Sequence, residues 1–227
     1  MADSLLQKLR TRVKEDKPIL WNFLGDSIAH GALHTWGWRA YVELFEERVR
    51  YQLGRRNDLV INGACSGSNI GSVANGLEHR CLRFHPDMVT IAVGMNDAVA
   101  GGDGVASFEK NYLAVIDRLR RQTAATVFLQ TPNTIDWANA ATRSALPEYA
   151  EAIRRIGRQA DVPVCDHYAV WERYQQTEGM QVFYLLNDPI HPNADGHRML
   201  ANTLLHWLGY GPMARKDPLE NFPVDPS

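Results

Sequence analysis

Cysteine is scarce in this 227-residue chain, and no two cysteines have the CxxC spacing. The three are Cys65, Cys81 and Cys165. An odd, sparse set of this kind argues against a disulfide framework, and it does not supply the ligands of a structural zinc site.

Excess charge and long apolar runs are also lacking. The net charge of −2 leaves no electrostatic footprint for nucleic acid or for an anionic membrane. No apolar stretch approaches the length of a membrane span. Residues 1–18 carry acids and bases throughout and contain no apolar segment of a secretory signal. We therefore expect a cytoplasmic protein with no nucleic-acid partner and no membrane span.

Apolar residues make up 45% of the chain, and their pattern predicts a parallel sheet. Short apolar runs typical of buried strands alternate with patterns of helical period. The alternation predicts right-handed βαβ units and an α/β fold with helices on both faces of the sheet. The predicted strands are residues 19–24, 59–62, 88–93, 126–130 and 162–166, and the predicted helices are about 38–51, 69–80, 107–121, 145–160 and 194–208.

One predicted helix shows its core-facing stripe clearly. Apolar residues recur there at helical spacing, and Ser107 is a passable N-cap. The stripe consists of Phe108, Tyr112, Val115, Ile116 and Leu119.

The chain divides into a main domain and two short extensions. We predict a helical N-terminal extension over residues 1–18, a main domain over 19–210, and an extended C-terminal tail over 211–227. The tail contains four prolines and shows no periodicity. Both extensions either pack on the domain or serve as contact surfaces in a homo-oligomer.

A serine follows the first predicted strand, in the segment Gly25-Asp26-Ser27. A free hydroxyl is a poor nucleophile and needs an adjacent base. Placed on a turn after a strand, Ser27 would expose its oxygen. Two readings stay open at this point: Ser27 is a nucleophile, or it only caps the helix that follows.

The best candidate for that base lies far along the chain, in Asp188-Pro189-Ile190-His191. Asp188 is close enough in sequence to accept a hydrogen bond from the imidazole of His191 and to fix its tautomer. An ordinary histidine pKa near ~6.5 suits a group that takes and returns a proton. The alternative is a histidine packed before the last helix.

Hydrolysis by a serine nucleophile would create a tetrahedral oxyanion, and losing one donor to such an oxyanion costs about 3–4 kcal/mol. Three donors are candidates: the N–H groups of Ser27 and Gly67 and the side-chain amide of Asn96. All follow predicted strands, whose carboxyl ends share one edge of a parallel sheet. Gly67 and Asn96 are also common types of loop residue.

Together these segments resemble the SGNH (GDSL-type) hydrolase family over about residues 19–207. The four family residues correspond to Ser27, Gly67, Asn96 and His191. The resemblance implies a flavodoxin-like three-layer α/β/α sandwich with a five-stranded parallel sheet, a serine acyl-enzyme, a small-molecule ester substrate, and no metal or organic cofactor. Two departures are mild: Ile28 replaces the leucine of GDSL, and Ala64 stands where many relatives have a glycine.

Four aromatic residues near the predicted site are candidates for substrate binding: Trp36, Trp38, Trp137 and Tyr184. They would stack on a sugar or line a short acyl pocket, or else they are core or edge packing. His30 and His34 have i, i+4 spacing, but a catalytic zinc needs a third ligand. We therefore expect no metal there, and histidines that face solvent or substrate.

The sequence favours a carboxylic ester hydrolase that removes short acyl groups, such as acetyl, from a carbohydrate or another polar alcohol. No long apolar lid segment is present to shelter a fatty chain. The alternatives are a lysophospholipase or thioesterase acting on longer acyl chains, an acyltransferase, and a non-catalytic α/β ligand-binding module.

Overall fold

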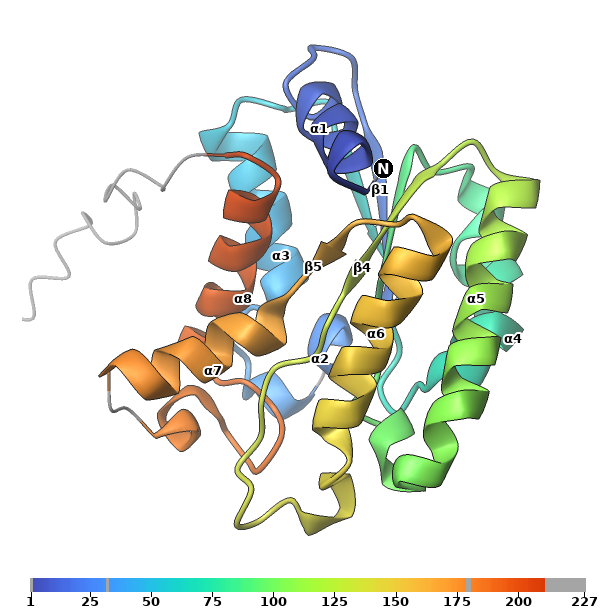
Figure 1. Ribbon diagram of the computed structural model, residues 1–227. Coiled ribbons are helices and arrows are strands. Elements are labelled where there is room, and N and C mark those ends of the chain that lie inside the picture. Colours follow the sequence, from blue (N-terminus) through green and yellow to red (C-terminus); the bar gives the residue numbers. More distant parts are fainter. Residues whose placement is uncertain (1, 32, 179–180, 211–227) are drawn as a thin grey trace, which may run out of the picture.

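The computed structural model describes residues 2–31, 33–178 and 181–210 (Figure 1). Its centre is a five-stranded sheet in the order β2-β1-β3-β4-β5, and every strand pair is parallel. The strand order reverses between β1 and β3, and α/β folds bind ligands at the carboxyl ends of such strands. The strands are β1 (Leu20–Gly25), β2 (Leu59–Asn62), β3 (Met88–Ala92), β4 (Thr126–Gln130) and β5 (Val164–Cys165).

Helices cover both faces of this sheet, which confirms the predicted α/β class. Figure 1 shows α3 (Tyr41–Glu47) and α8 (Ala194–Trp207) on one face. The other face carries α4 (Ile70–Arg80), α5 (Val105–Gln122) and α6 (Leu146–Ala160). The remaining helices are α1 (Ala2–Arg12), α2 (Ser27–His30) and α7 (His167–Glu178), with short helical turns at Leu33–Thr35, Arg48–Gln52, Leu82–Phe84, Asp97–Ala100, Gly102–Gly104, Ala141–Arg143 and Val182–Leu185.

The hydrophobic core is formed by the residues that the apolar pattern predicts to be buried. The predicted apolar stripe of α5 is buried along its whole length. On the opposite face, the rings of Trp21 and Phe23 from β1 each lie 5.1 Å from the ring of Phe45 on α3. These contacts fix α3 against the sheet.

One N-cap prediction was wrong, and one helix was missed. Ser107 is not an N-cap, because α5 begins at Val105 and Gly104 occupies the cap position. Helix α7 was not predicted at all. Only three of its residues with described side chains, His167, Tyr168 and Trp171, are buried, so its apolar stripe is too short to stand out.

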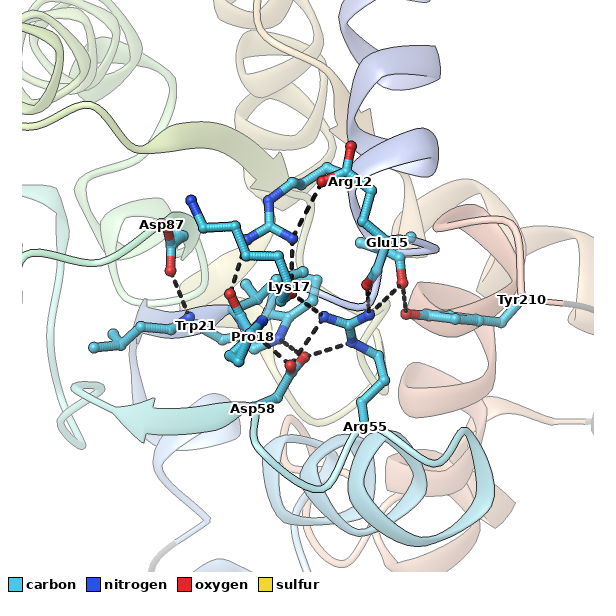
Figure 2. A network of polar contacts seen from close by, with 12 residues as sticks. Arg12, Glu15, Lys17, Pro18, Trp21, Arg55, Asp58, Asp87 and Tyr210 are labelled. Carbon is cyan, nitrogen blue, oxygen red and sulfur yellow. Dashed lines mark hydrogen bonds and ion pairs between the residues drawn. The ribbon is translucent and has the colours of Figure 1, made fainter.

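A buried ion pair between Arg55 and Asp58 lies at the amino ends of β1 and β2 (Figure 2). The guanidinium of Arg55 donates to both carboxylate oxygens of Asp58, at 2.7 and 2.9 Å. It also donates to the main-chain carbonyls of Val13, Glu15 and Lys17. One arginine thus holds the segment after α1 against the edge of the sheet.

Helix α1 packs on the domain through Leu9, which is fully buried. Arg10 on the same helix donates to the carbonyl of Trp207 at 2.9 Å. The predicted tail, 211–227, lies outside the described residues. The division into three parts and the homo-oligomer stay predictions. Within the described ranges, no helix combines the length and apolar character needed to cross a bilayer.

Candidate active site

The nucleophile candidate sits at the junction of β1 and α2. Asp26 is the N-cap of α2, and its carboxylate accepts the N–H of Ile28 at 3.0 Å. Ser27 is the first residue of α2, so the helix supplies no acceptor for its N–H. A Cβ on Gly25 would lie 2.7 Å from that of Ala29, so only glycine fits before the cap.

The structure brings Ser27, His191 and Asp188 together. Nε2 of His191 lies 2.9 Å from Oγ of Ser27, and Nδ1 lies 2.6 Å from a carboxylate oxygen of Asp188. Ser27 and His191 are 6% and 8% exposed, so bulk water has little access to the hydrogen bond between them. The geometry suits transfer of the serine proton to the imidazole.

Asp188 is held in one orientation by the loop that carries it. Its Oδ1 accepts the N–H groups of Ile190 at 2.9 Å and His191 at 2.8 Å, which leaves Oδ2 for the imidazole. Burial raises the pKa of Asp188, but these three hydrogen bonds outweigh it and the net shift is downward. The carboxylate therefore stays charged beside the imidazole.

The pKa of His191 is lowered from its ordinary value. Burial is the main cause, because it disfavours the imidazolium. The hydrogen bond and charge of Asp188 act in the opposite direction, while the charges of His34 and Arg143 lower the pKa further. The net effect keeps the imidazole neutral, the form that accepts a proton.

The loops after β2 and β3 carry the other candidate residues. Gly67 has a φ of +79°, a conformation that L side chains rarely adopt. A Cβ there would meet no protein atom within 4 Å, so within the protein it is the backbone conformation that requires the glycine. The amide of Asn96 donates one hydrogen to the carbonyl of Ser68 at 3.0 Å, and its second hydrogen is available.

Hydrogen bonds tie these loops to the nucleophile. The N–H of Cys65 donates to the carbonyl of Gly25 at 3.0 Å, and the side chain of Asn62 donates to that of Ala29 at 2.8 Å. The carboxylate of Asp97 accepts the N–H of Ile70 at 2.9 Å, which links the loop after β3 to α4. The segments that carry Ser27, Gly67 and Asn96 are therefore braced at one rim.

Two carboxyl groups next to this rim are unusually basic. Burial raises the pKa of Asp26 to about 7, with a smaller contribution from the charge of Asp97. Burial likewise raises the pKa of Asp97 to about 6. Asp26 lies directly after β1 and Asp97 lies in the turn Asp97–Ala100 after β3, so each carboxyl group adds a negative charge beside the nucleophile loop only as the pH rises through its raised pKa.

Sequence reasoning missed the residues that hold the Asp188–His191 loop. The amide of Asn133, after β4, donates to the carbonyl of Ile190 at 3.1 Å. The N–H of Asp136 donates to the carbonyl of Pro189 at 2.9 Å. Each is an ordinary loop residue in the sequence, so no local signal distinguishes it.

His34 is the closest aromatic neighbour of the triad histidine among the described residues. Its ring lies 3.6 Å from that of His191, with 1° between the planes. His30 does not join it and is bonded to Ser66 instead.

Ligand atoms of His34, Asp188 and His191 lie within 4.8 Å of one another. Because the rings are parallel, their in-plane lone pairs do not converge on one point. Both nitrogens of His191 are also engaged by Ser27 and Asp188. As arranged, these residues are not a preformed metal site.

The four predicted aromatic residues are all exposed, from 43% for Trp137 to 71% for Trp36. They are not core residues. Trp36 and Trp38 follow His34 in the chain, and Trp137 follows Asp136, the residue bonded to the Asp188–His191 loop. Tyr184 accepts a hydrogen bond from Asn193 through its carbonyl at 2.7 Å. Each is therefore exposed and close in sequence to a residue that contacts the triad or lies beside its loop.

Sequence comparison assigns this arrangement to a known class. Residues 23–199 match the GDSL-like lipase/acylhydrolase family. The chain belongs to this family, whose members are carboxylic ester hydrolases, and the match confirms the resemblance read from the four segments.

Three individual relatives each cover most of this chain. An acetylxylan esterase of Geobacillus stearothermophilus is 27% identical over 209 residues, covering 83% of this chain and 93% of the relative. The crystal structure of the acetyl xylan esterase AlAXEase is 25% identical with a TM-score of 0.70, covering 83% of this chain and 98% of that chain. The α/β hydrolase LAE5, from the metagenome of Lake Arreo, is 23% identical with a TM-score of 0.72, covering 85% and 95%.

A further match reaches only part of the chain. A protein of Mycoplasma pneumoniae described as uncharacterized is 30% identical over 115 residues, which is 49% of this chain. The chain covers 13% of that protein's length.

Proposed function

We propose that the protein is a serine esterase that removes acetyl groups from a carbohydrate by way of an acyl-enzyme. The observation that carries the proposal is the continuous hydrogen-bonded line from Ser27 through His191 to Asp188. The exposure of Trp36, Trp38 and Trp137, which are close in sequence to residues that contact the triad or its loop, further supports the proposal.

In the first step, His191 takes the proton of Ser27 while the serine oxygen attacks the ester carbonyl. Asp188 holds the imidazole with its proton on Nδ1, so that Nε2 is the acceptor. The same carboxylate stabilises the imidazolium that forms. His191 then gives the proton to the departing alcohol.

The oxyanion of the intermediate is bound by the N–H groups of Ser27 and Gly67 and by the free hydrogen of the Asn96 amide. Donors fixed in advance cost no reorganisation when charge develops, which is the main source of rate in such sites. Water then attacks the acyl-enzyme with the same base and donors, and the acid and free serine are regenerated.

The proposal of an acetylated sugar rests on two kinds of support. Exposed Trp36, Trp38 and Trp137 suit stacking against pyranose rings, since aromatic faces bind apolar ring surfaces. Two relatives that cover most of the chain are described as acetylxylan esterases. We therefore take acetylated xylooligosaccharides as the first substrates to test.

The decisive experiment has two arms. In the first, purified protein is treated with a fluorophosphonate probe, and the modified peptide is identified by mass spectrometry. We expect the adduct on Ser27 and none in Ser27→Ala. In the second, acetate release from acetylated xylooligosaccharides is measured beside a series of p-nitrophenyl esters. Ser27→Ala should lower kcat by several powers of ten without unfolding the protein.

The outcomes separate the alternatives. An optimum at octanoyl or longer esters would favour a lysophospholipase or thioesterase and contradict the acetyl preference. Transfer of acetyl to an added alcohol in place of water would indicate an acyltransferase. Folded protein with no adduct and no hydrolysis would favour a ligand-binding module.

A further inference from the structure

The catalytic base candidate is covered on one face by a second histidine. The rings of His34 and His191 are parallel at 3.6 Å, which is van der Waals contact over the whole ring face. His34 lies in the helical turn Leu33–Thr35, which follows the nucleophile helix, whereas His191 precedes α8. The contact therefore links the segment that follows Ser27 to the loop that carries Asp188 and His191, through a residue that is not itself a member of the triad.

The position of His34 is fixed by a separate hydrogen bond. The amide of Asn187, the residue before Asp188, donates to the main-chain carbonyl of His34 at 2.8 Å. Asn187 in turn donates its N–H to the carbonyl of His191 at 2.8 Å. A single asparagine thus holds the stacked ring and closes the loop that carries both His191 and Asp188.

This geometry limits how the His191 ring can move. Rotation of the imidazole about its χ2 angle would drive its edge into the ring of His34, because the two planes are in contact. The rotation that breaks the Ser27 and Asp188 hydrogen bonds is therefore opposed sterically. The stack also shields one face of His191 from water.

Charged groups around the His191 ring also affect its protonation. When His34 carries a proton, its charge opposes protonation of the ring beneath it. The titratable and charged groups facing His191 are Asp188, His34, Arg143 and His197. Of these, Asp188 favours the imidazolium, and His34 and Arg143 disfavour it.

We propose that His34 is a positioning residue for the catalytic histidine: its stacked ring holds His191 on the line between Ser27 and Asp188. This rests on the proposed function. It predicts an effect of His34 on turnover without any contact between His34 and the reacting ester.

Two substitutions separate the ring from its charge. His34→Phe keeps a flat ring in the stack, whereas His34→Ala removes the ring and opens the face to water. We expect His34→Ala to lower kcat for p-nitrophenyl acetate by about tenfold, a part of the 10²- to 10⁴-fold that general base catalysis supplies. KM should change much less. His34→Phe should keep most of kcat.

The pH profile provides the readout that a purely structural role would not move. Loss of the His34 charge should raise the pKa of His191, so the acid limb of kcat/KM moves to higher pH in both variants. The shift should be larger in His34→Ala, because water also reaches the ring. His79→Ala, which removes an exposed histidine on α4 bonded to Arg83, is the matched control and should leave the profile unchanged.

The results decide the proposal directly. Folded His34→Ala with the wild-type kcat and acid limb would overturn it. A raised KM with unchanged kcat would also overturn it, because that pattern indicates substrate contact. Wild-type protein that neither hydrolyses esters nor reacts with the fluorophosphonate would instead refute the proposed function, so the two failures are distinguishable.

Discussion

Replacing Asp188 by asparagine tests the triad with almost no change of shape. In the structure, Oδ1 accepts two main-chain N–H groups, and Oδ2 accepts Nδ1–H of His191. An amide has one oxygen and one NH₂ group, so it cannot accept on both sides. The oxygen should stay with the two N–H groups, and the NH₂ group should face the imidazole. His191 then carries its proton on Nε2 and cannot accept the serine proton.

The size of the effect follows from the cost of the opposite amide orientation. That orientation would turn NH₂ against two N–H donors, at roughly 1–3 kcal/mol for each unsatisfied donor. Because the Asp188 side chain is 39% exposed, water relieves part of this cost, and we take about 2–4 kcal/mol in total. At 1.4 kcal/mol for each factor of ten, the productive tautomer falls by about 30- to 1,000-fold.

We therefore expect kcat of Asp188→Asn to fall by about 30- to 1,000-fold, with KM and thermal stability close to wild type. The assay is initial-rate hydrolysis of p-nitrophenyl acetate, with the melting temperature as the check on folding. Asp195→Asn is the control, because it makes the same change at an exposed residue paired with Arg198. A folded Asp188→Asn enzyme with more than about a third of wild-type kcat would refute the tautomer argument.

Two further predictions concern pH and stability. His191 must be neutral to act as the base, and its pKa is lowered from 6.5, mainly by burial. Activity should thus persist above that pKa and disappear below it, with the acid midpoint of kcat/KM under 6.5; a midpoint above 6.5 would contradict this. Arg55→Met should cost about 3–5 kcal/mol in urea unfolding, because it strands the buried Asp58 carboxylate, while kcat is unchanged. Arg198→Met, at an exposed pair, should cost less than ~1 kcal/mol, and equal losses in the two variants would refute the argument.

Local patterns in the sequence were enough to predict most of the scaffold. Buried strands and amphipathic helices are recognisable because apolar residues recur at the period of the element that buries them. The stripe of α5 and the run of β4 are examples, and both agree with the structure. Helix α7 was not predicted because few of its residues are buried, so its sequence carries no long apolar stripe at helical spacing.

In the candidate site, too, local patterns were predictable from the sequence and contacts between distant segments were not. The order of Gly25-Asp26-Ser27, Gly67, Asn96 and His191 was readable because each segment has its own local chemistry. The stacking of His34 on His191 was not, since it joins residues that are distant in sequence and leaves no pattern in either segment. The same holds for Asn133 and Asn187, whose amides hold the triad loop.

The sequence by itself determined the class of fold, the order of the strands along the chain and the residues with the right chemistry. Only the tertiary structure decided which side chains touch, because contacts between distant segments depend on how helices and loops pack around the sheet. It showed that Gly67 is required by its backbone angle, that the tryptophans are exposed, and that a second imidazole covers the first.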